Sequence, residues 1–246
     1  MHYVMSDIHG QYYKYLSLLD KIGFNESDTL YVLGDCVDRG PYPLDTLSDV
    51  LGRKNVVMLM GNHEKMMLDS FNDPSNTALW YRNGAEATMR QLSALGKFSI
   101  KRLMRKVSGL PLVIPDLNVG GKTFYLAHAS HAAAYIGKTL KYPAANEDTV
   151  YQVLWSREYI NAAKGNIMSY CLTSQYKELY AMYPKDTTLI CGHTPVYRCA
   201  YGKADRCGNG RISRTMGGHL INIDCGGAIG RQLGCLRLED MHEFYC

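Results

Sequence analysis

The stretch at residues 31–40 reads YVLGDCVDRG and joins an apolar run to a turn that carries two carboxylates and an arginine. The same arrangement lies on either side of it. Upstream, Tyr3-Val4-Met5 leads into Ser6-Asp7-Ile8-His9-Gly10, and downstream, Val56–Met60 leads into Gly61-Asn62-His63-Glu64. Short apolar runs that end in glycine and polar residues are typical of buried strands followed by tight loops. The sequence therefore predicts a sheet whose strand ends carry functional side chains.

Helical patterns separate these runs. Residues 11–22 place apolar side chains at helical spacing before Gly23, and Pro43–Leu51 begins with a proline. Strands that alternate with helices predict a parallel sheet with helices packed over it. Residues 64–108 are mostly helical in pattern. The basic residues within 97–106 favour a solvated helix face, with an anionic docking patch as the alternative.

The second half of the chain continues the strand pattern. Leu112–Leu117 and Thr123–Ala127 flank Gly120-Gly121, which suits a tight reversal between paired strands. Further strands are predicted at Thr188–Cys191, Leu220–Asp224 and Gly234–Leu238. No repeat, low-complexity stretch or Pro/Ser-rich linker interrupts the pattern, so we expect a single domain over residues 1–246.

The composition indicates a folded protein of the cytoplasm. Of its 246 residues, 46% are hydrophobic and 20% are charged, which is typical of globular chains. We find neither a signal peptide nor an apolar run long enough to span a membrane. Eight cysteines without a Cys-x-x-Cys pair favour reduced, buried thiols. The net charge of +4 does not call for nucleic acid and suits an anionic substrate.

Side chains of the metal-ligand type follow the predicted strands: Asp7, His9, Asp35, Asn62, His128 and His193. Oxygen and nitrogen donors without a thiolate suit manganese, iron or zinc. Asp35 carries two oxygens and can bridge two cations, and cations about 3.5–4 Å apart can hold a hydroxide and clamp a phosphoryl oxygen. A lone histidine at a strand end is usually structural. Five loops that each offer a ligand instead indicate a site for two metal ions.

These loops resemble the three signature blocks of the phosphoprotein phosphatase (PPP) family, which belongs to the calcineurin-like metallophosphoesterases. The similar blocks are Asp7-Ile8-His9-Gly10, Gly34–Gly40, Gly61–Glu64, Trp155-Ser156-Arg157, Gly192-His193-Thr194-Pro195 and Ile223–Ala228. The likeness covers nearly the whole chain and is weakest in the middle. The short length is similar to that of the bacterial and phage branch, which is lambda phosphatase-like. The resemblance implies a four-layer α/β fold with a central mixed β-sandwich flanked by helices.

The resemblance also implies a ligand set for two divalent or trivalent ions, with manganese expected and iron or zinc as alternatives. The first ion would be held by Asp7, His9 and Asp35. The second would share Asp35 and add Asn62, His128 and His193.

The catalytic residues implied by the resemblance are Arg39, Arg157, His63 and Asp38. The two arginines would grip the phosphate, because a planar guanidinium matches tetrahedral oxyanions. His63 would protonate the leaving alkoxide, and Asp38 would hold its other nitrogen and favour the charged form. The implied reaction is in-line attack of a dimetal-bound hydroxide on a phosphomonoester, without a phosphoenzyme intermediate.

The expected enzyme is a serine/threonine protein phosphatase, with phosphotyrosine as a further possible substrate, so its partner is a phosphorylated protein or peptide. The alternative is a symmetrical diadenosine tetraphosphate hydrolase. That group usually ends its third block in Asn-His-Asp and lacks an aspartate before the arginine of its second, so Glu64 and Asp38 favour the phosphatase. A catalytically inactive module that binds phosphorylated partners is disfavoured by the intact pair of His63 and Asp38.

Four other features have no part in the implied reaction. His131 is expected to lie outside the ligand set. Cys36 adjoins Asp35, and a buried inert thiol is favoured over a site of oxidative inactivation. The Ile223–Ala228 block is expected to pack under the site. The basic segment Arg198–Arg214 is interpreted as a surface loop, with guidance of acidic phosphopeptides as the alternative.

Overall fold

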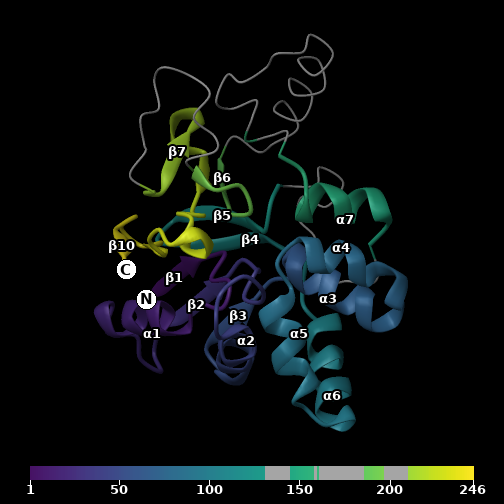
Figure 1. The fold of residues 1–246 in the computed structure, drawn as a ribbon. Coiled ribbons are helices and arrows are strands. Elements are labelled where there is room, and N and C mark those ends of the chain that lie inside the picture. Colours follow the sequence, from purple (N-terminus) through teal and green to yellow (C-terminus); the bar gives the residue numbers. More distant parts are fainter. Residues whose placement is uncertain (131–144, 158–159, 161–185, 197–209) are drawn as a thin grey trace.

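The computed structural model describes residues 1–130, 145–157, 160, 186–196 and 210–246, which form two sheets with helices outside them (Figure 1). The first sheet contains β1 (His2–Met5), β2 (Thr29–Val32), β3 (Val56–Met58), β9 (Gly234–Arg237) and β10 (Glu243–Tyr245). The second sheet contains β4 (Val113–Val119), β5 (Lys122–Ala127), β6 (Thr187–Cys191), β7 (Ser213–Thr215) and β8 (Leu220–Asn222). The strand orders are β10-β9-β1-β2-β3 and β4-β5-β6-β8-β7.

In each sheet three neighbouring strands pair in parallel, and the other two strands join the sheet through antiparallel pairings. In the first sheet β1, β2 and β3 run parallel, while β9 and β10 run antiparallel to their neighbours. In the second sheet β5, β6 and β8 run parallel, and the edge strands β4 and β7 are antiparallel. Pro115 lies in β4, where an edge position leaves its missing N–H without consequence. The sheets are therefore mixed, as the resemblance implied, and not purely parallel.

Helices connect the strands and extend to one side of the sandwich (Figure 1). They are α1 (Tyr12–Lys21), α2 (Pro43–Gly52), α3 (Asn62–Asn72), α4 (Thr77–Arg82), α5 (Glu86–Ser93), α6 (Lys97–Ser108) and α7 (Glu147–Leu154). Short 3-10 helices lie at Pro74–Asn76, Met216–Gly218 and Gly227–Ile229. The helices α1 and α2 are the crossovers that parallel pairing of β1, β2 and β3 requires.

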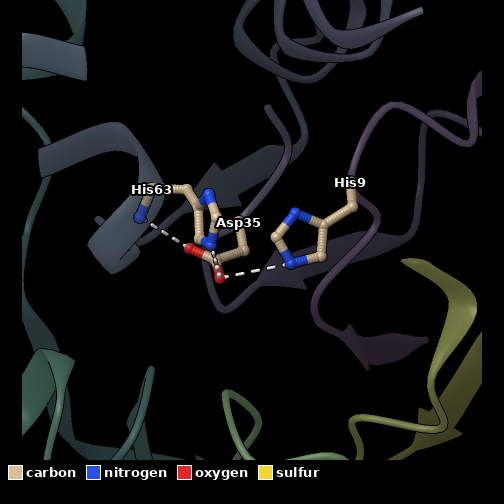
Figure 2. Close-up of side chains that lie close together, drawn as sticks. All are labelled: His9, Asp35 and His63. Carbon is tan, nitrogen blue, oxygen red and sulfur yellow. Dashed lines mark hydrogen bonds and ion pairs between the residues drawn. The ribbon is translucent and has the colours of Figure 1, made fainter. Parts of the chain in front are cut away.

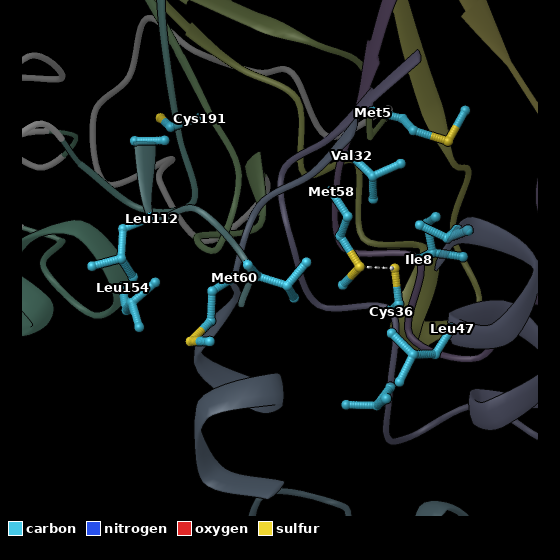
Figure 3. Packing of buried hydrophobic residues seen from close by; sticks show 14 of the residues in the cluster. Met5, Ile8, Val32, Cys36, Leu47, Met58, Met60, Leu112, Leu154 and Cys191 are labelled. Carbon is cyan, nitrogen blue, oxygen red and sulfur yellow. Dashed lines mark hydrogen bonds between the residues drawn. The ribbon is translucent and has the colours of Figure 1, made fainter. Parts of the chain in front are cut away.

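The alternation of side chains along the strands divides the core into two parts. In β1, Val4 belongs to a cluster fed by both sheets, whereas Tyr3 and Met5 belong to the cluster that the helices cover. In β6, Ile190 and Leu189 divide in the same way. Figure 3 shows part of the larger cluster, with Met5 among its members. Successive residues of a strand face opposite sides, so the order of layers is helix, sheet, sheet, helix, and the four-layer fold is confirmed.

Most predicted elements are present within a residue or two of their expected bounds. The predicted strand over Val56–Met60 ends at Met58. The strands β7 and β10 and the helix α7 were not predicted. The basic residues of α6 are exposed, in agreement with a solvated helix face. Within the described ranges, none of the helices has both the length and the apolar character needed to cross a membrane.

Candidate active site

Five parallel strands bring their carboxyl ends to one end of the sandwich. Asp7 follows β1, Asp35 follows β2, and Asn62 begins α3 shortly after β3. In the second sheet, His128 follows β5 and His193 follows β6. Loops at the carboxyl ends of neighbouring parallel strands form a shared crevice. The fold therefore brings the predicted ligands from both sheets into one neighbourhood.

A first group of potential ligands consists of His9, Asp35 and His63, whose ligand atoms lie within 4.8 Å of one another (Figure 2). His9 Nε2 lies 3.4 Å from Asp35 Oδ2, and His63 Nε2 lies 3.9 Å from the same oxygen. The Arg39 guanidinium donates to both rings, at 2.8 Å to His9 Nε2 and 2.8 Å to His63 Nε2. Because arginine can only donate, each Nε2 accepts here and presents a lone pair, which is what a metal ion requires.

A second group consists of Asp35, His128 and His193, with ligand atoms again within 4.8 Å of one another. His128 Nε2 lies 3.5 Å from Asp35 Oδ2. The oxygen of Asn62 lies 2.9 Å from His128 Nε2 and 3.0 Å from His193 Nδ1. Asp35 belongs to both groups, so its carboxylate is placed to bridge two cations.

Backbone carbonyls determine which nitrogen of His9 and His128 carries the proton. His9 Nδ1 donates to the Val37 carbonyl at 2.8 Å, and His128 Nδ1 donates to the Leu33 carbonyl at 2.7 Å. Each Nε2 therefore presents a lone pair. The lone pair of His128 faces the Asn62 oxygen, which is also an acceptor. Because facing acceptors repel unless a cation lies between them, the donor set fits bound metal.

Asp7 links the two sheets. Its Oδ2 accepts hydrogen bonds from Ser6 Oγ at 2.6 Å and from the His193 backbone N–H at 2.9 Å. Its Oδ1 lies 4.0 Å from His9 Nε2. Asp7 therefore faces the first group from slightly farther away than Asp35 does, and its position depends on the loop of the second sheet.

Left-handed backbone marks the same loops. Among the described non-glycine residues, seven have positive φ, and all but Met241 belong to the site: Asp7, His9, Asp35, Asp38, Arg39 and His193. This conformation costs about 1–2 kcal/mol per residue and persists only where the surroundings hold it. The sequence identified these residues, but nothing in it indicated their backbone conformation.

Glu64 holds the loop that carries Asp35. Its side chain is fully buried, and its two oxygens accept from the backbone N–H groups of Asp35 (2.8 Å), Cys36 (2.8 Å), Val37 (3.2 Å) and Gly61 (3.1 Å). Burial raises the pKa of Glu64, and the amide donors act in the opposite direction. In the sequence, this residue separated two enzyme groups but gave no sign of its structural role.

The side chain of His63 has the predicted carboxylate partner. Its Nδ1 donates to Asp38 Oδ2 at 2.6 Å. Trp80 Nε1 donates to the same oxygen at 2.8 Å, and Thr88 Oγ1 donates to Asp38 Oδ1 at 2.5 Å. Burial raises the pKa of Asp38 to about 6, although the bonds from Thr88 and Trp80 lower it. Helical spacing gave no signal for these two contacts.

The charge state of His63 differs from the expectation. Burial and then the Arg39 guanidinium hold the pKa of His63 well below its ordinary value, which favours the neutral ring. Asp38 orients the imidazole without charging it, because Arg39 donates to the other nitrogen. Burial also lowers the pKa of His9, His128 and His193. Neutral imidazoles are the form that binds metal.

A pocket of about 310 Å³ opens beside the two groups. It is lined by His193, a member of the second group, and by Arg39, which donates to the first. Its other charged and apolar walls include Arg82, Arg157, Asp224 and Ile229. Arg157 is exposed beyond the end of α7 and reaches the pocket, as the resemblance implied. Arg82 was not predicted, because a lone arginine in a helical stretch carries no sequence signal.

The Ile223–Ala228 block forms part of the pocket wall. Asp224, Gly226 and Ala228 line it, and Asp224 Oδ1 accepts from the Gly226 N–H at 3.0 Å. The expectation that this block packs under the site holds for Ile223 and Cys225, which are buried in the core cluster fed by both sheets, but not for the three residues that line the pocket. The reason is that the turn after β8 folds up beside the loop after β6, where the Val196 N–H donates to the Asp224 carbonyl at 3.0 Å.

The other residues that the sequence singled out lie in the core, at the periphery, or outside the described residues. Cys36 is fully buried with Sγ 3.9 Å from Met58 Sδ, and burial holds its pKa well above the ordinary value, which agrees with an inert thiol (Figure 3). Arg211 lies over the Tyr245 ring, and Arg214 pairs with Glu243. His131 and residues 198–209 of the basic segment lie outside the described residues.

Gly192 gives a test of the link between the sheets. A Cβ there would lie 2.2 Å from Asp7 Oδ2 and 2.2 Å from Ser6 Oγ. Gly192→Ala is therefore expected to displace Asp7 and to weaken manganese binding by roughly 10–100-fold, as measured by titration calorimetry. Gly52→Ala is the control, because its Cβ would meet nothing within 4 Å. Unchanged manganese affinity in Gly192→Ala would count against a ligand role for Asp7.

Comparison with known proteins agrees with this geometry. The model of the calcineurin-like phosphoesterase family matches residues 3–219, and the chain belongs to that family. It is thus a metallophosphoesterase, and its two ligand groups suit the two metal ions that the family uses.

The relatives include two kinds of enzyme. Serine/threonine-protein phosphatase 1 of Salmonella typhimurium is 31% identical over 166 residues, which cover 67% of this chain and 72% of that protein. A symmetrical bis(5'-nucleosyl)-tetraphosphatase of Neisseria gonorrhoeae is 44% identical over 69 residues, which cover 27% of this chain and 25% of that one. The structure of a serine/threonine phosphatase from Saccharomyces cerevisiae has a TM-score of 0.57 at 15% identity, covering 100% of this chain and 78% of that one.

Proposed function

We propose that this metallophosphoesterase is a protein phosphatase that acts on phosphoserine and phosphothreonine, with phosphotyrosine as a further substrate. The observation that carries the proposal is the buried pair of His63 and Asp38, joined at 2.6 Å. A phosphorylated alcohol leaves as a strongly basic alkoxide, which needs a proton in the transition state. A nucleoside phosphate leaves as a stabilised anion and has much less need of one. A built proton donor therefore favours phosphorylated alcohols as substrates.

Two bound cations fit the donor set, and we propose the ligands that the resemblance implied. Asp7, His9 and Asp35 would hold one ion, and Asp35 with Asn62, His128 and His193 would hold the other. Donors of nitrogen and oxygen alone suit manganese, with iron or zinc as alternatives. When bound, such ions activate water at neutral pH and neutralise charge on phosphoryl oxygens.

The two arginines would orient the phosphoryl group. Arg39 bonds to His9 and His63 in this structure, and an arriving phosphate offers its guanidinium stronger, charge-assisted bonds. Transfer of Arg39 from the rings to the phosphate frees His63 Nε2. Negative charge of the phosphate beside that nitrogen favours its protonation. His63 can then donate the proton from Nε2 to the leaving oxygen, while Asp38 holds Nδ1. Arg157, which lines the same pocket, would add a second guanidinium to the phosphate.

His63→Asn tests the proton donor through the leaving group. We expect the variant to lose about 10²–10⁴-fold in kcat on a phosphoserine peptide and much less on p-nitrophenyl phosphate, whose leaving group needs little protonation. Its manganese content, measured by elemental analysis, is expected to match that of the unaltered protein. Equal losses on both substrates would argue against the role of His63 as the acid. Loss of manganese would make His63 a ligand instead.

The second candidate is hydrolysis of dinucleoside polyphosphates, which the similarity to the Neisseria gonorrhoeae enzyme favours. That similarity spans fewer residues than the likeness to the Salmonella typhimurium phosphatase. A direct comparison decides between them. Purified protein with manganese is expected to hydrolyse a phosphoserine peptide with a higher kcat/KM than diadenosine tetraphosphate. The opposite order would replace the proposed function by this second one.

A further inference from the structure

The pocket contains one arginine more than the two that the proposed function assigns to the scissile phosphate. Arg39 and Arg157 are the arginines that the proposed function uses. A third, Arg82, lines the same pocket, and Asp224 is the carboxylate among the described lining residues. Three arginines against one carboxylate leave a formal charge of +2 on these side chains, before any bound metal is counted. The third arginine, together with the charge of any bound cations, suits a substrate with more than one anionic group.

The guanidinium of Arg82 is available to a ligand. The side chain is exposed at the end of α4. Among the described residues, Arg82 donates a long hydrogen bond from Nε to the Ala78 carbonyl, at 3.3 Å. That bond uses one edge of the guanidinium and leaves its Nη groups to face the pocket or solvent. An arginine so placed can offer two parallel N–H groups to an oxyanion.

The position of Arg82 relative to Arg39 is fixed by the backbone. The Arg39 N–H donates to the Gly84 carbonyl at 2.9 Å, two residues after Arg82. Gly84 has a φ of +98°, and a Cβ there would meet Arg39 Cγ at 3.0 Å, so the turn and the Arg39 loop are in close contact. Asn83 Nδ2 in turn donates to the Leu79 carbonyl at 2.8 Å, which anchors the turn to α4. Arg82 is therefore held beside the phosphate-binding arginine by the turn that follows it.

We propose that Arg82 is a specificity residue that binds a second anionic group of the substrate, next to the phosphoryl group undergoing hydrolysis. The inference rests on the proposed function for the place of the scissile phosphate, which Arg39 marks. The second anion is supplied by a carboxylate beside the phosphorylated residue of a peptide, or by the next phosphate of a condensed chain. In both cases the chemistry at Arg82 is the same, a guanidinium facing an oxyanion.

The test compares Arg82→Gln with Arg90→Gln, a control on an exposed arginine of α5 that does not line the pocket. With manganese at low salt, the substrates are a phosphoserine peptide flanked by alanines, the same peptide flanked by glutamates, and diadenosine tetraphosphate. For Arg82→Gln, we expect the ratio of kcat/KM for the glutamate peptide over the alanine peptide to fall about tenfold, mainly through KM. Arg90→Gln is expected to keep the ratio. If Arg82→Gln lowered kcat/KM for diadenosine tetraphosphate alone, the second anion would be assigned to a condensed phosphate.

A binding experiment separates this inference from the proposed function. Titration calorimetry of the manganese-loaded protein would compare pyrophosphate with phosphate, and Arg82→Gln is expected to weaken pyrophosphate about tenfold more than phosphate. A protein that hydrolyses no phosphopeptide but shows this selective loss would refute the proposed substrate and keep the role of Arg82. Equal effects of Arg82→Gln on both anions and all substrates, or none on any, would overturn that role.

Discussion

Asp35→Asn is expected to lower kcat on a phosphopeptide by at least about 10³-fold, because it removes the charge of the carboxylate that both ligand groups share. A metal ion contributes several kcal/mol of transition-state stabilisation, and each 1.36 kcal/mol corresponds to a factor of ten in rate. Steady-state kinetics and elemental analysis of the purified variant would measure the losses of activity and of manganese. Asp20→Asn, at an exposed position of α1, is the control. A variant with full manganese content and normal kcat would exclude the bridging role.

The same substitution separates function from stability. Burial and then the neighbouring carboxylates of Asp7 and Glu64 hold the pKa of Asp35 well above its ordinary value, so its charge opposes folding without metal. Asparagine is neutral and can still accept the His63 N–H, which lies 3.0 Å from Oδ1. In the presence of a metal chelator, we therefore expect Asp35→Asn to have a melting temperature no lower than that of the unaltered protein. Manganese should raise the melting temperature of the unaltered protein only, because a bound ligand stabilises the folded state and the variant has lost the shared carboxylate. Equal shifts in both would contradict this account.

Glu64→Gln is expected to destabilise the protein by about 2–4 kcal/mol, since the lost charge weakens several buried hydrogen bonds at once. An amide nitrogen cannot accept, so it would face the backbone N–H groups that one carboxylate oxygen now satisfies. The Asp35 loop would then lose its support, and kcat should fall as well. Urea unfolding of the metal-free proteins measures the stability directly, without a contribution from metal affinity.

The control for this change is Glu86→Gln, at an exposed glutamate that accepts a hydrogen bond from the Tyr81 hydroxyl at 2.7 Å. We expect it to change the free energy of unfolding by less than about 0.5 kcal/mol. If the two variants unfolded at the same urea concentration, the four amide contacts of Glu64 would not be the support that we infer.

The sequence predicted the parts of the fold that depend on local pattern. The strands β1 and β6 lie within one residue of their predicted bounds, because buried strands read as continuous apolar runs. The strand β10 has only three half-buried residues and exists through its pairing with β9, so it left no such run. The helix α7 did have a signal. Asn146 caps it by accepting the Thr149 N–H at 2.8 Å, and two acidic residues follow, but this start was not recognised.

The sequence predicted which residues form the site, but not which residues hold them in place. Strand-end positions identified the potential ligands, since the carboxyl ends of parallel strands converge. The contacts of Asp38 with Trp80 and Thr88 span 42 and 50 residues and join a loop to helix faces. A helical pattern shows which side of a helix is buried, but it does not show which polar group that side will meet. For the same reason, the sequence did not show the backbone hydrogen bonds that Glu64 accepts or the place of Arg82 in the pocket.

The division of the proposed ligands between two sheets has a consequence for the newly made protein. Asp7, Asp35 and Asn62 emerge early in synthesis, whereas His193 comes 186 residues after Asp7, whose carboxylate its backbone N–H meets. A growing chain on the ribosome thus holds an incomplete set of donors until most of its length has been translated. Phosphoester cleavage can begin only once the loop that carries His193 has joined the loops of the first sheet, so the onset of turnover would report that stage of folding.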